Sequence, residues 1–213
     1  VWRRARDSGA GAVLVAAAEE EIAAAVRAVG GDTVLTDPDL LSGTDRVAQA
    51  AGLRDPERRF GFIVNLQGDL PTLDPAAIGA CLAPLADPNV DIATLASEIR
   101  DAEEARNPNV VKAIADLGSD RPVAVASDFR RDIDSAGGGT LWHHIGIYAF
   151  RRAALERFVL LAPSEREKAR RLEQMRALDA GMTIAVARVD TAPFGVDTPA
   201  DLERARATIA SRR

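Results

Sequence analysis

The chain has 213 residues, 47% of them apolar and 28% charged, with a formal net charge of -5. This balance is typical of a folded globular domain, and the negative charge argues against a nucleic-acid-binding surface, which is usually strongly basic. A single cysteine rules out an internal disulfide, and without a long uncharged apolar run or a secretory signal we expect a cytoplasmic protein with no membrane span.

The apolar pattern predicts short strands that alternate with helices. The expected strands are residues 12–16, 33–36, 62–66, 91–95, 110–115, 123–126, 145–150 and 182–189. The expected helices are residues 19–29, a helix capped by Ser42 or Thr44 that runs to 51, one that starts at Asp74, and residues 163–178 and 198–209. This alternation predicts an α/β domain with a mostly parallel sheet and helices on both faces. Residues 132–140 are rich in glycine, and we expect a mobile loop there.

The stretch NLQGDLP, residues 65–71, follows the expected strand 62–66 and ends it on a glutamine, a glycine and a carboxylate. Ligands of such sheets bind beyond the carboxyl ends of the strands. Gly68 allows a close backbone approach, Asp69 offers a hard oxygen ligand suited to Mg²⁺, and Gln67 can hydrogen-bond a sugar or a base. Taken alone, the stretch is equally compatible with a plain turn.

Two further stretches place polar side chains at a helix start. Residues 194–202, FGVDTPADL, deliver Asp197 immediately before a helix, and residues 41–46, LSGTDR, offer two hydroxyls and a glycine. A helix start of this kind can cradle an anion or a polar base. The alternative at each place is an ordinary helix cap, with Thr198 or Asp197 as the cap of one helix and Arg46 solvated on the other.

Both histidines of the chain, His143 and His144, are adjacent and directly precede the expected strand 145–150. Neighbours on a strand point to opposite faces, so the two rings are not expected to share a metal ion. His144, Gly146 and Tyr148 would share one face. The alternative is a core strand with one exposed histidine. Farther along, Glu173 and Gln174 fall in a densely charged stretch that by itself indicates only a solvated helix face.

Taken together and in order, six segments resemble the 3-deoxy-manno-octulosonate cytidylyltransferase family, the CMP-Kdo synthetases. These segments are SGTDR at 42–46, NLQGDLP at 65–71, NPNVVK at 107–112, HHIGIYAF at 143–150, LEQMRAL at 172–178 and GVDTPADLERAR at 195–206. The resemblance implies a Rossmann-like nucleotide-diphospho-sugar transferase fold, with a small β arm in the 110–150 region for dimerisation. It also implies a homodimer that joins CTP and Kdo into CMP-Kdo and pyrophosphate, with Mg²⁺.

The resemblance also implies which residues form the site. Asp69 and Asp197 would hold the magnesium ion and act in catalysis. The nucleotide would lie by Ser42, Gly43, Thr44 and Arg46. The Kdo pocket would be lined by Gln67, His144, Tyr148, Glu173 and Gln174.

The family begins with a strand and a basic glycine-containing loop that grips the triphosphate, and this sequence starts after them. We therefore expect residues 1–213 to be a single nucleotidyltransferase domain, incomplete at its N-terminus, and to be poorly soluble and inactive when expressed alone. Two alternatives stay open. One is another sugar-acid or sugar-phosphate nucleotidyltransferase, such as a CMP-sialate synthetase, since fold alone does not fix the substrate. The other is a non-catalytic degenerate relative.

Overall fold

The computed structural model describes residues 1–132, 139–196 and 198–211 of the chain, so most of the expected loop at 132–140 lies outside the described residues. The strands are β1 Leu14–Ala17, β2 Asp32–Leu35, β3 Phe62–Leu66, β4 Ile92–Glu98, β5 Lys112–Ala115, β6 Val123–Arg130, β7 Trp142–Arg151 and β8 Ile184–Val189. The helices are α1 Trp2–Asp7, α2 Glu20–Ala28, α3 Gly43–Arg54, α4 Ala76–Leu82, η1 Ala83–Ala86 (a 3₁₀ helix), α5 Ala102–Arg106, α6 Arg152–Val159, α7 Glu165–Arg170, α8 Gln174–Asp179 and α9 Pro199–Ala210.

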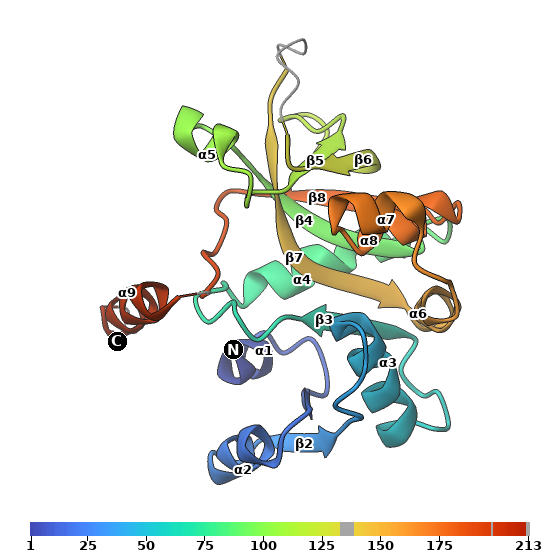
Figure 1. The fold of residues 1–213 in the computed structure, drawn as a ribbon, viewed down its shortest axis with the longest axis vertical. Helices are drawn as coiled ribbons and strands as arrows, with labels where there is room; N and C mark the ends of the chain where they lie inside the picture. The colour runs from blue at the N-terminus through green and yellow to red at the C-terminus, as the bar shows by residue number, and fades with distance from the viewer. Residues whose placement is uncertain (133–138, 197, 212–213) are drawn as a thin grey trace.

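These strands form two sheets. β1 and β2 pair in parallel, and the other six strands are ordered β3-β7-β4-β8-β6-β5, with a further pairing between β5 and β7. That last pairing joins β7, β4, β8, β6 and β5 into a closed, barrel-like ring. The β1–β2 sheet with α2 lies at one end of the molecule and the β5–β6 hairpin at the other (Figure 1). The hairpin occupies the place of the predicted β arm.

The prediction of a mostly parallel sheet is wrong for the larger sheet. Among its pairings in the described part of the chain, β4 with β8 is parallel, and the pairings of β7 with β3, β4 and β5, and of β6 with β5 and β8, are antiparallel. The reason lies in the connections. Strands β5, β6 and β7 follow one another without a helix between β5 and β6, and such strands pair antiparallel. β7 lies between β3 and β4 in the sheet and runs antiparallel to both.

Helices cover both faces of the sheet, as the sequence predicts. Alternate residues of β8 serve two cores: Ile184 and Val186 pack with α6 and α8, whereas Ala185 and Ala187 pack with α4 and η1. This is the period-2 arrangement of a strand buried on both sides. Cys81, on α4, is fully buried in the second core.

The long helix predicted over 163–178 is wrong: two short helices, α7 and α8, occupy this stretch. Arg171 ends α7 in the left-handed region, with φ 53° and ψ 48°. Leu172 then turns into the core, where it is 5% exposed. Because the chain reverses here, Glu173 and Gln174 stand at the start of α8 rather than along a solvated face. The charge-rich pattern of the stretch concealed this break.

Several local predictions are confirmed. β3 has the bounds expected, Ser42 caps α3 by accepting the N–H of Asp45, and Thr198 forms a capping box with Asp201 at α9. Helix α6 was not predicted. No helix in the described part of the chain combines the length and the apolar character needed to cross a bilayer.

Arg176 holds α8 against α7. Its guanidinium donates to both carboxylate oxygens of Glu167, at 2.8 and 2.6 Å, and lies over the ring of Phe158. Both side chains are largely buried, at 6% and 13% exposure. We expect Arg176→Met to lower the free energy of unfolding by about 3 kcal/mol, because the Glu167 carboxylate would be left buried without its partner.

The matched control is Arg206→Met, which removes an exposed ion pair with Glu203 on α9 and should cost less than about 0.5 kcal/mol. Urea unfolding of the two variants measures both values. Similar small losses in the two would show that the Arg176 pair does not hold the helices together.

Candidate functional site

The carboxyl end of β3 meets the segment that precedes α9. The backbone N–H of Val196 donates to the backbone carbonyl of Asp69 at 2.9 Å. The Asp69 residue is exposed, whereas Leu70 beside it is buried. Two stretches that are more than a hundred residues apart in the sequence therefore run side by side at this edge of the sheet. Asp197, the residue after Val196, lies outside the described residues.

The start of α3 packs against the same strand end. A Cβ on Gly43 would lie 3.1 Å from Nε2 and 3.2 Å from Oε1 of Gln67, so glycine is what allows the Gln67 amide to lie against the helix. Ser42 is occupied by the cap, with its hydroxyl also donating to the Asp45 carboxylate at 2.9 Å. The two sequence stretches SGTDR and NLQGDLP are thus in direct contact.

The Arg46 side chain bonds to the chain just beyond β2. Its guanidinium donates to the Thr36 hydroxyl at 2.6 Å and to the Asp37 carbonyl at 3.0 Å, just beyond β2. It is therefore not the solvated side chain of the alternative reading. The structure shows it fixing the chain after β2 to the first turns of α3.

A chain of buried and partly buried hydrogen bonds connects three of the expected segments. The Gln67 amide nitrogen donates to the Asn65 side-chain oxygen at 2.9 Å, and the Asn65 amide nitrogen donates to the Thr44 hydroxyl at 3.2 Å. The Thr44 hydroxyl in turn donates to Glu173 Oε2 at 2.8 Å. We call this series, Gln67–Asn65–Thr44–Glu173, the polar chain. It links β3, α3 and the start of α8.

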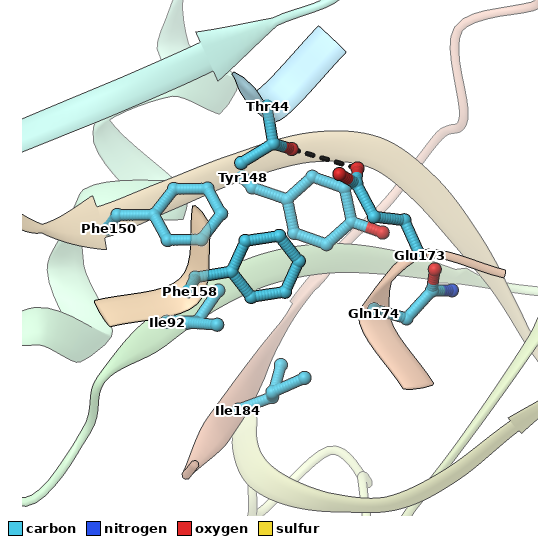
Figure 2. A pocket seen from close by; sticks show the side chains of 8 residues that line it. All are labelled: Thr44, Ile92, Tyr148, Phe150, Phe158, Glu173, Gln174 and Ile184. Carbon is cyan, nitrogen blue, oxygen red and sulfur yellow. Dashed lines mark hydrogen bonds between the residues drawn. The ribbon is translucent and has the colours of Figure 1, made fainter. Parts of the chain in front are cut away.

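The polar chain ends at a small pocket (Figure 2). One side of this pocket is polar and the other is aromatic and aliphatic. It is lined by Thr44, Glu173, Gln174, Tyr148, Phe150, Phe158, Ile92 and Ile184. Four of the predicted site residues, Thr44, Tyr148, Glu173 and Gln174, therefore share one pocket, although they come from α3, β7 and the region of α8.

Burial controls the charges in this pocket. Desolvation raises the pKa of Glu173, against the opposing effects of the nearby Ser42 and Thr44 hydroxyls and the Arg176 guanidinium. Its Oε1 atom is buried and has no hydrogen-bond partner among the described residues. Desolvation, aided by the charge of Glu173, also raises the pKa of Tyr148. The Tyr148 phenol is accordingly neutral at physiological pH.

His144 lies beside Tyr148, with ring centroids 5.4 Å apart, and also contacts the Phe129 ring edge to face. Burial lowers the pKa of His144 to about 3, so the imidazole is neutral. His144 Nε2 lies 3.0 Å from the Thr94 hydroxyl, which also lies 2.8 Å from the Ile147 carbonyl oxygen.

His143 has different surroundings. Its Nδ1 lies 2.6 Å from the Glu104 carboxylate on α5. The two histidines therefore engage separate partners, as expected for neighbours on a strand. Among the described residues, no group of three or more His, Cys, Asp and Glu side chains is placed to hold a metal ion.

Sequence reasoning did not identify Asn65, Thr94 or Phe158 as parts of the site. Asn65 is a polar residue inside an apolar strand and is 2% exposed. Buried polar side chains of this kind are almost always hydrogen-bonded, and that expectation was the available signal. Phe158 lies on the unpredicted helix α6, and the bond between Thr94 and His144 depends on strand register.

Comparisons with known proteins point to one family. The model of the cytidylyltransferase family matches residues 1–184. A 3-deoxy-manno-octulosonate cytidylyltransferase of Parvibaculum lavamentivorans is 58% identical over 212 residues, covering 100% of this chain and 82% of that protein. One from Paramagnetospirillum magneticum is 56% identical over 209 residues, covering 98% and 85%. A solved CMP:2-keto-3-deoxy-manno-octonic acid synthetase, complexed with CTP, superposes with a TM-score of 0.87 at 34% identity, covering 100% of this chain and 86% of that one.

The neutral imidazole of His144 predicts a pH effect on stability. Its pKa is depressed in the folded state, so the unfolded chain binds a proton below about pH 6.5 that the native protein does not bind until about pH 3. The contribution to stability is present above pH 6.5 and is lost as the pH falls through this window. Between pH 6.5 and pH 5 we expect the protein to lose about 2 kcal/mol through this group.

His144→Gln keeps a nitrogen donor for Thr94 but does not titrate. Urea unfolding at pH 6.5 and pH 5 should therefore show a smaller loss in the variant, by about that 2 kcal/mol. An equal loss in the two proteins would contradict the assignment of a buried neutral imidazole.

Proposed function

The chain belongs to the 3-deoxy-manno-octulosonate cytidylyltransferase family, and from this membership we propose that it transfers the cytidylyl group of CTP to Kdo, giving CMP-Kdo and pyrophosphate. It is a nucleotidyltransferase. The observation that carries the proposal is the polar chain. It joins the segments SGTDR, NLQGDLP and LEQMRAL, which the resemblance assigns to nucleotide and sugar acid, around one pocket.

We assign the start of α3 to the cytidine, through Ser42, Gly43 and Thr44. The free backbone N–H groups of a helix start support contact with a polar base or a phosphate. Arg46 belongs to this part of the site through its bonds beyond β2, which support the position of α3. Direct contact between Arg46 and the nucleotide stays a prediction.

We assign the sugar side of the site to Kdo, with Tyr148, Glu173 and Gln174 from the pocket, His144 beside Tyr148, and Gln67 joined to them through the polar chain. Most of these side chains are neutral donors or acceptors, which suits a substrate rich in hydroxyl groups. Because His144 and Tyr148 are held neutral by burial, they are placed to orient the sugar rather than to exchange protons with it.

Mg²⁺ belongs to the proposal, with Asp69 and Asp197 as its ligands. Carboxylate oxygens are the ligands this ion prefers, and the bond between Val196 and Asp69 supports a shared site because it brings the chain before Asp197 to the end of β3. When bound, the ion would neutralise negative charge on the triphosphate and lower the pKa of the attacking hydroxyl.

The chemistry asks little covalent work of the protein. A hydroxyl oxygen of the sugar acid attacks the α-phosphorus, its proton is released, and the bond to pyrophosphate breaks. Catalysis then depends on holding the two substrates in line and on matching their charge. A buried polar chain that connects the nucleotide side of the site to the sugar side fits that requirement.

Two further parts of the proposal rest on the family rather than on the geometry. We propose a homodimer that uses the β5–β6 hairpin, and a cytoplasmic location. The rival is a transferase for another sugar acid, such as a CMP-sialate synthetase. The non-catalytic alternative is opposed by the relatives' names and by the joined segments of the site.

The test is a substrate panel with the protein expressed from its complete reading frame. We expect pyrophosphate release from CTP with Kdo and not with N-acetylneuraminate. In the same assay, Asp69→Asn should lower turnover at least a hundredfold, since losing such an interaction costs on the order of 3–4 kcal/mol in the transition state. Asp74→Asn is the matched control in the same loop, because its amide oxygen can still accept the N–H of Ala76.

Activity with N-acetylneuraminate but not Kdo would favour the rival transferase. No release of pyrophosphate with either acid would support the non-catalytic alternative. Normal turnover by the Asp69→Asn variant would show that Asp69 is not a ligand of the metal ion.

Gly43 and Gly52 provide a second test on one helix. An added methyl group at Gly43 would press on the Gln67 amide, whereas one at Gly52 would meet nothing within 4 Å. Both positions lie in α3, where Ala is the better helix former by roughly 0.5–1 kcal/mol. We therefore expect Gly43→Ala to lower kcat/KM for Kdo at least fivefold with no loss of stability, and Gly52→Ala to leave kcat/KM unchanged. Equal values of kcat/KM for Kdo in the two variants would show that the start of α3 does not contribute to the use of the sugar.

A further inference from the structure

Asn65 has a central place in the site, although the resemblance assigns it no role. It is 2% exposed, lies within β3, and its two amide atoms bond in opposite directions. Its oxygen accepts from Gln67 and its nitrogen donates to Thr44. An apolar side chain would satisfy the strand at this place without the cost of burying an amide. The use of an amide here calls for a reason beyond the fold.

The order of donors and acceptors along the polar chain is determined from one end. The Thr44 hydroxyl gives its single hydrogen to Glu173 Oε2, 2.8 Å away. Thr44 can then only accept from Asn65, which must present its nitrogen to Thr44 and its oxygen to Gln67. Gln67 must in turn present its nitrogen to Asn65.

This order decides what Gln67 offers to a ligand. With one hydrogen of its nitrogen bonded to Asn65, the Gln67 amide keeps Oε1 and the second hydrogen of Nε2, and no bond to Oε1 is made within the described residues. Gly43 leaves room for the amide beside α3. The bond to Asn65 therefore fixes which end of the amide carries Oε1, and a hydroxyl group can complement that atom as a donor.

We propose that Asn65 is a positioning residue for the sugar substrate: it holds the Gln67 amide so that Oε1 accepts a hydroxyl hydrogen of the sugar acid. This inference rests on the proposed function and adds to it the group of the substrate that Gln67 reads. Without Asn65, no bond to that residue fixes which end of the Gln67 amide faces the sugar. Binding of the sugar hydroxyl to Oε1 is then weakened, because the amide must first be oriented.

The experiment is a double-mutant cycle in the protein expressed from its complete reading frame. The variants are Asn65→Leu, Gln67→Ala and the double variant, with KM for Kdo, KM for CTP and the thermal midpoint measured for each. Losing an interaction that holds a substrate hydrogen bond costs roughly tenfold in binding. We expect Asn65→Leu to raise KM for Kdo by about that factor, and to raise KM for CTP less, because Thr44 keeps its bond to Glu173. In the Gln67→Ala background the same substitution should change KM for Kdo less than about twofold, because coupled residues are not additive.

Two further variants guard against a failure to fold and separate positioning from packing. Asn65→Ser is small and polar but too short to reach Gln67, so it should raise KM for Kdo as Asn65→Leu does. Asn65→Asp keeps the shape of the side chain. At pH 6 its buried carboxyl is protonated, donates to Thr44 and accepts from Gln67, so KM for Kdo should return close to that of the unchanged protein.

An unchanged KM for Kdo in Asn65→Leu and Asn65→Ser, with only the thermal midpoint lowered, would overturn the proposal and leave Asn65 a structural residue. Full additivity with Gln67→Ala would overturn it as well. Failure of the unchanged protein to use Kdo would be seen in the first arm of the experiment. That result would overturn the proposed function, and with it the role given to Asn65.

Discussion

The arrangement of the site depends on one series of buried and partly buried hydrogen bonds, from Gln67 through Asn65 and Thr44 to Glu173. This series joins three separate segments to one another: the end of β3, the first turn of α3 and the entrance to α8. In a low-dielectric interior such bonds are strong and their loss is costly, so the series fixes both distances and directions. The position of the pocket walls follows from it.

The same burial that strengthens these bonds also determines the chemistry that the pocket can perform. It keeps the His144 imidazole and the Tyr148 phenol neutral, and it raises the pKa of Glu173. A site of neutral donors and acceptors recognises hydroxyl groups well but exchanges protons poorly near pH 7. This suits a transfer in which substrate alignment does most of the work, while the Asp69 carboxylate lies outside the pocket, at the exposed end of β3.

Local patterns in the sequence indicated where polar residues stand at element ends, but it was the family resemblance that grouped Thr44, Tyr148, Glu173 and Gln174 into one site, and the structure places these four around one pocket. Thr44 and Gln67 follow clear cap and strand signals, and Tyr148 lies on a clear apolar strand. Asn65 was missed because one polar residue in an apolar strand gives no sign of which partners it meets. The direction of β7 was also missed, since periodicity reports the exposure of a strand and not the direction of its neighbours. The contact between Val196 and Asp69 depends on tertiary structure that no local pattern carries.

The break between α7 and α8 shows how local and tertiary terms combine at the site. A continuous helix is what propensity favours, and the left-handed conformation of Arg171 costs on the order of 1–2 kcal/mol. Burial of Leu172 in the core and the paired bonds between Glu167 and Arg176 offset that cost. The turn at Arg171 then directs Glu173 to Thr44, where it accepts the hydroxyl hydrogen at the end of the polar chain. The polarity with which Gln67 meets its ligand therefore depends on a turn more than a hundred residues away in the sequence.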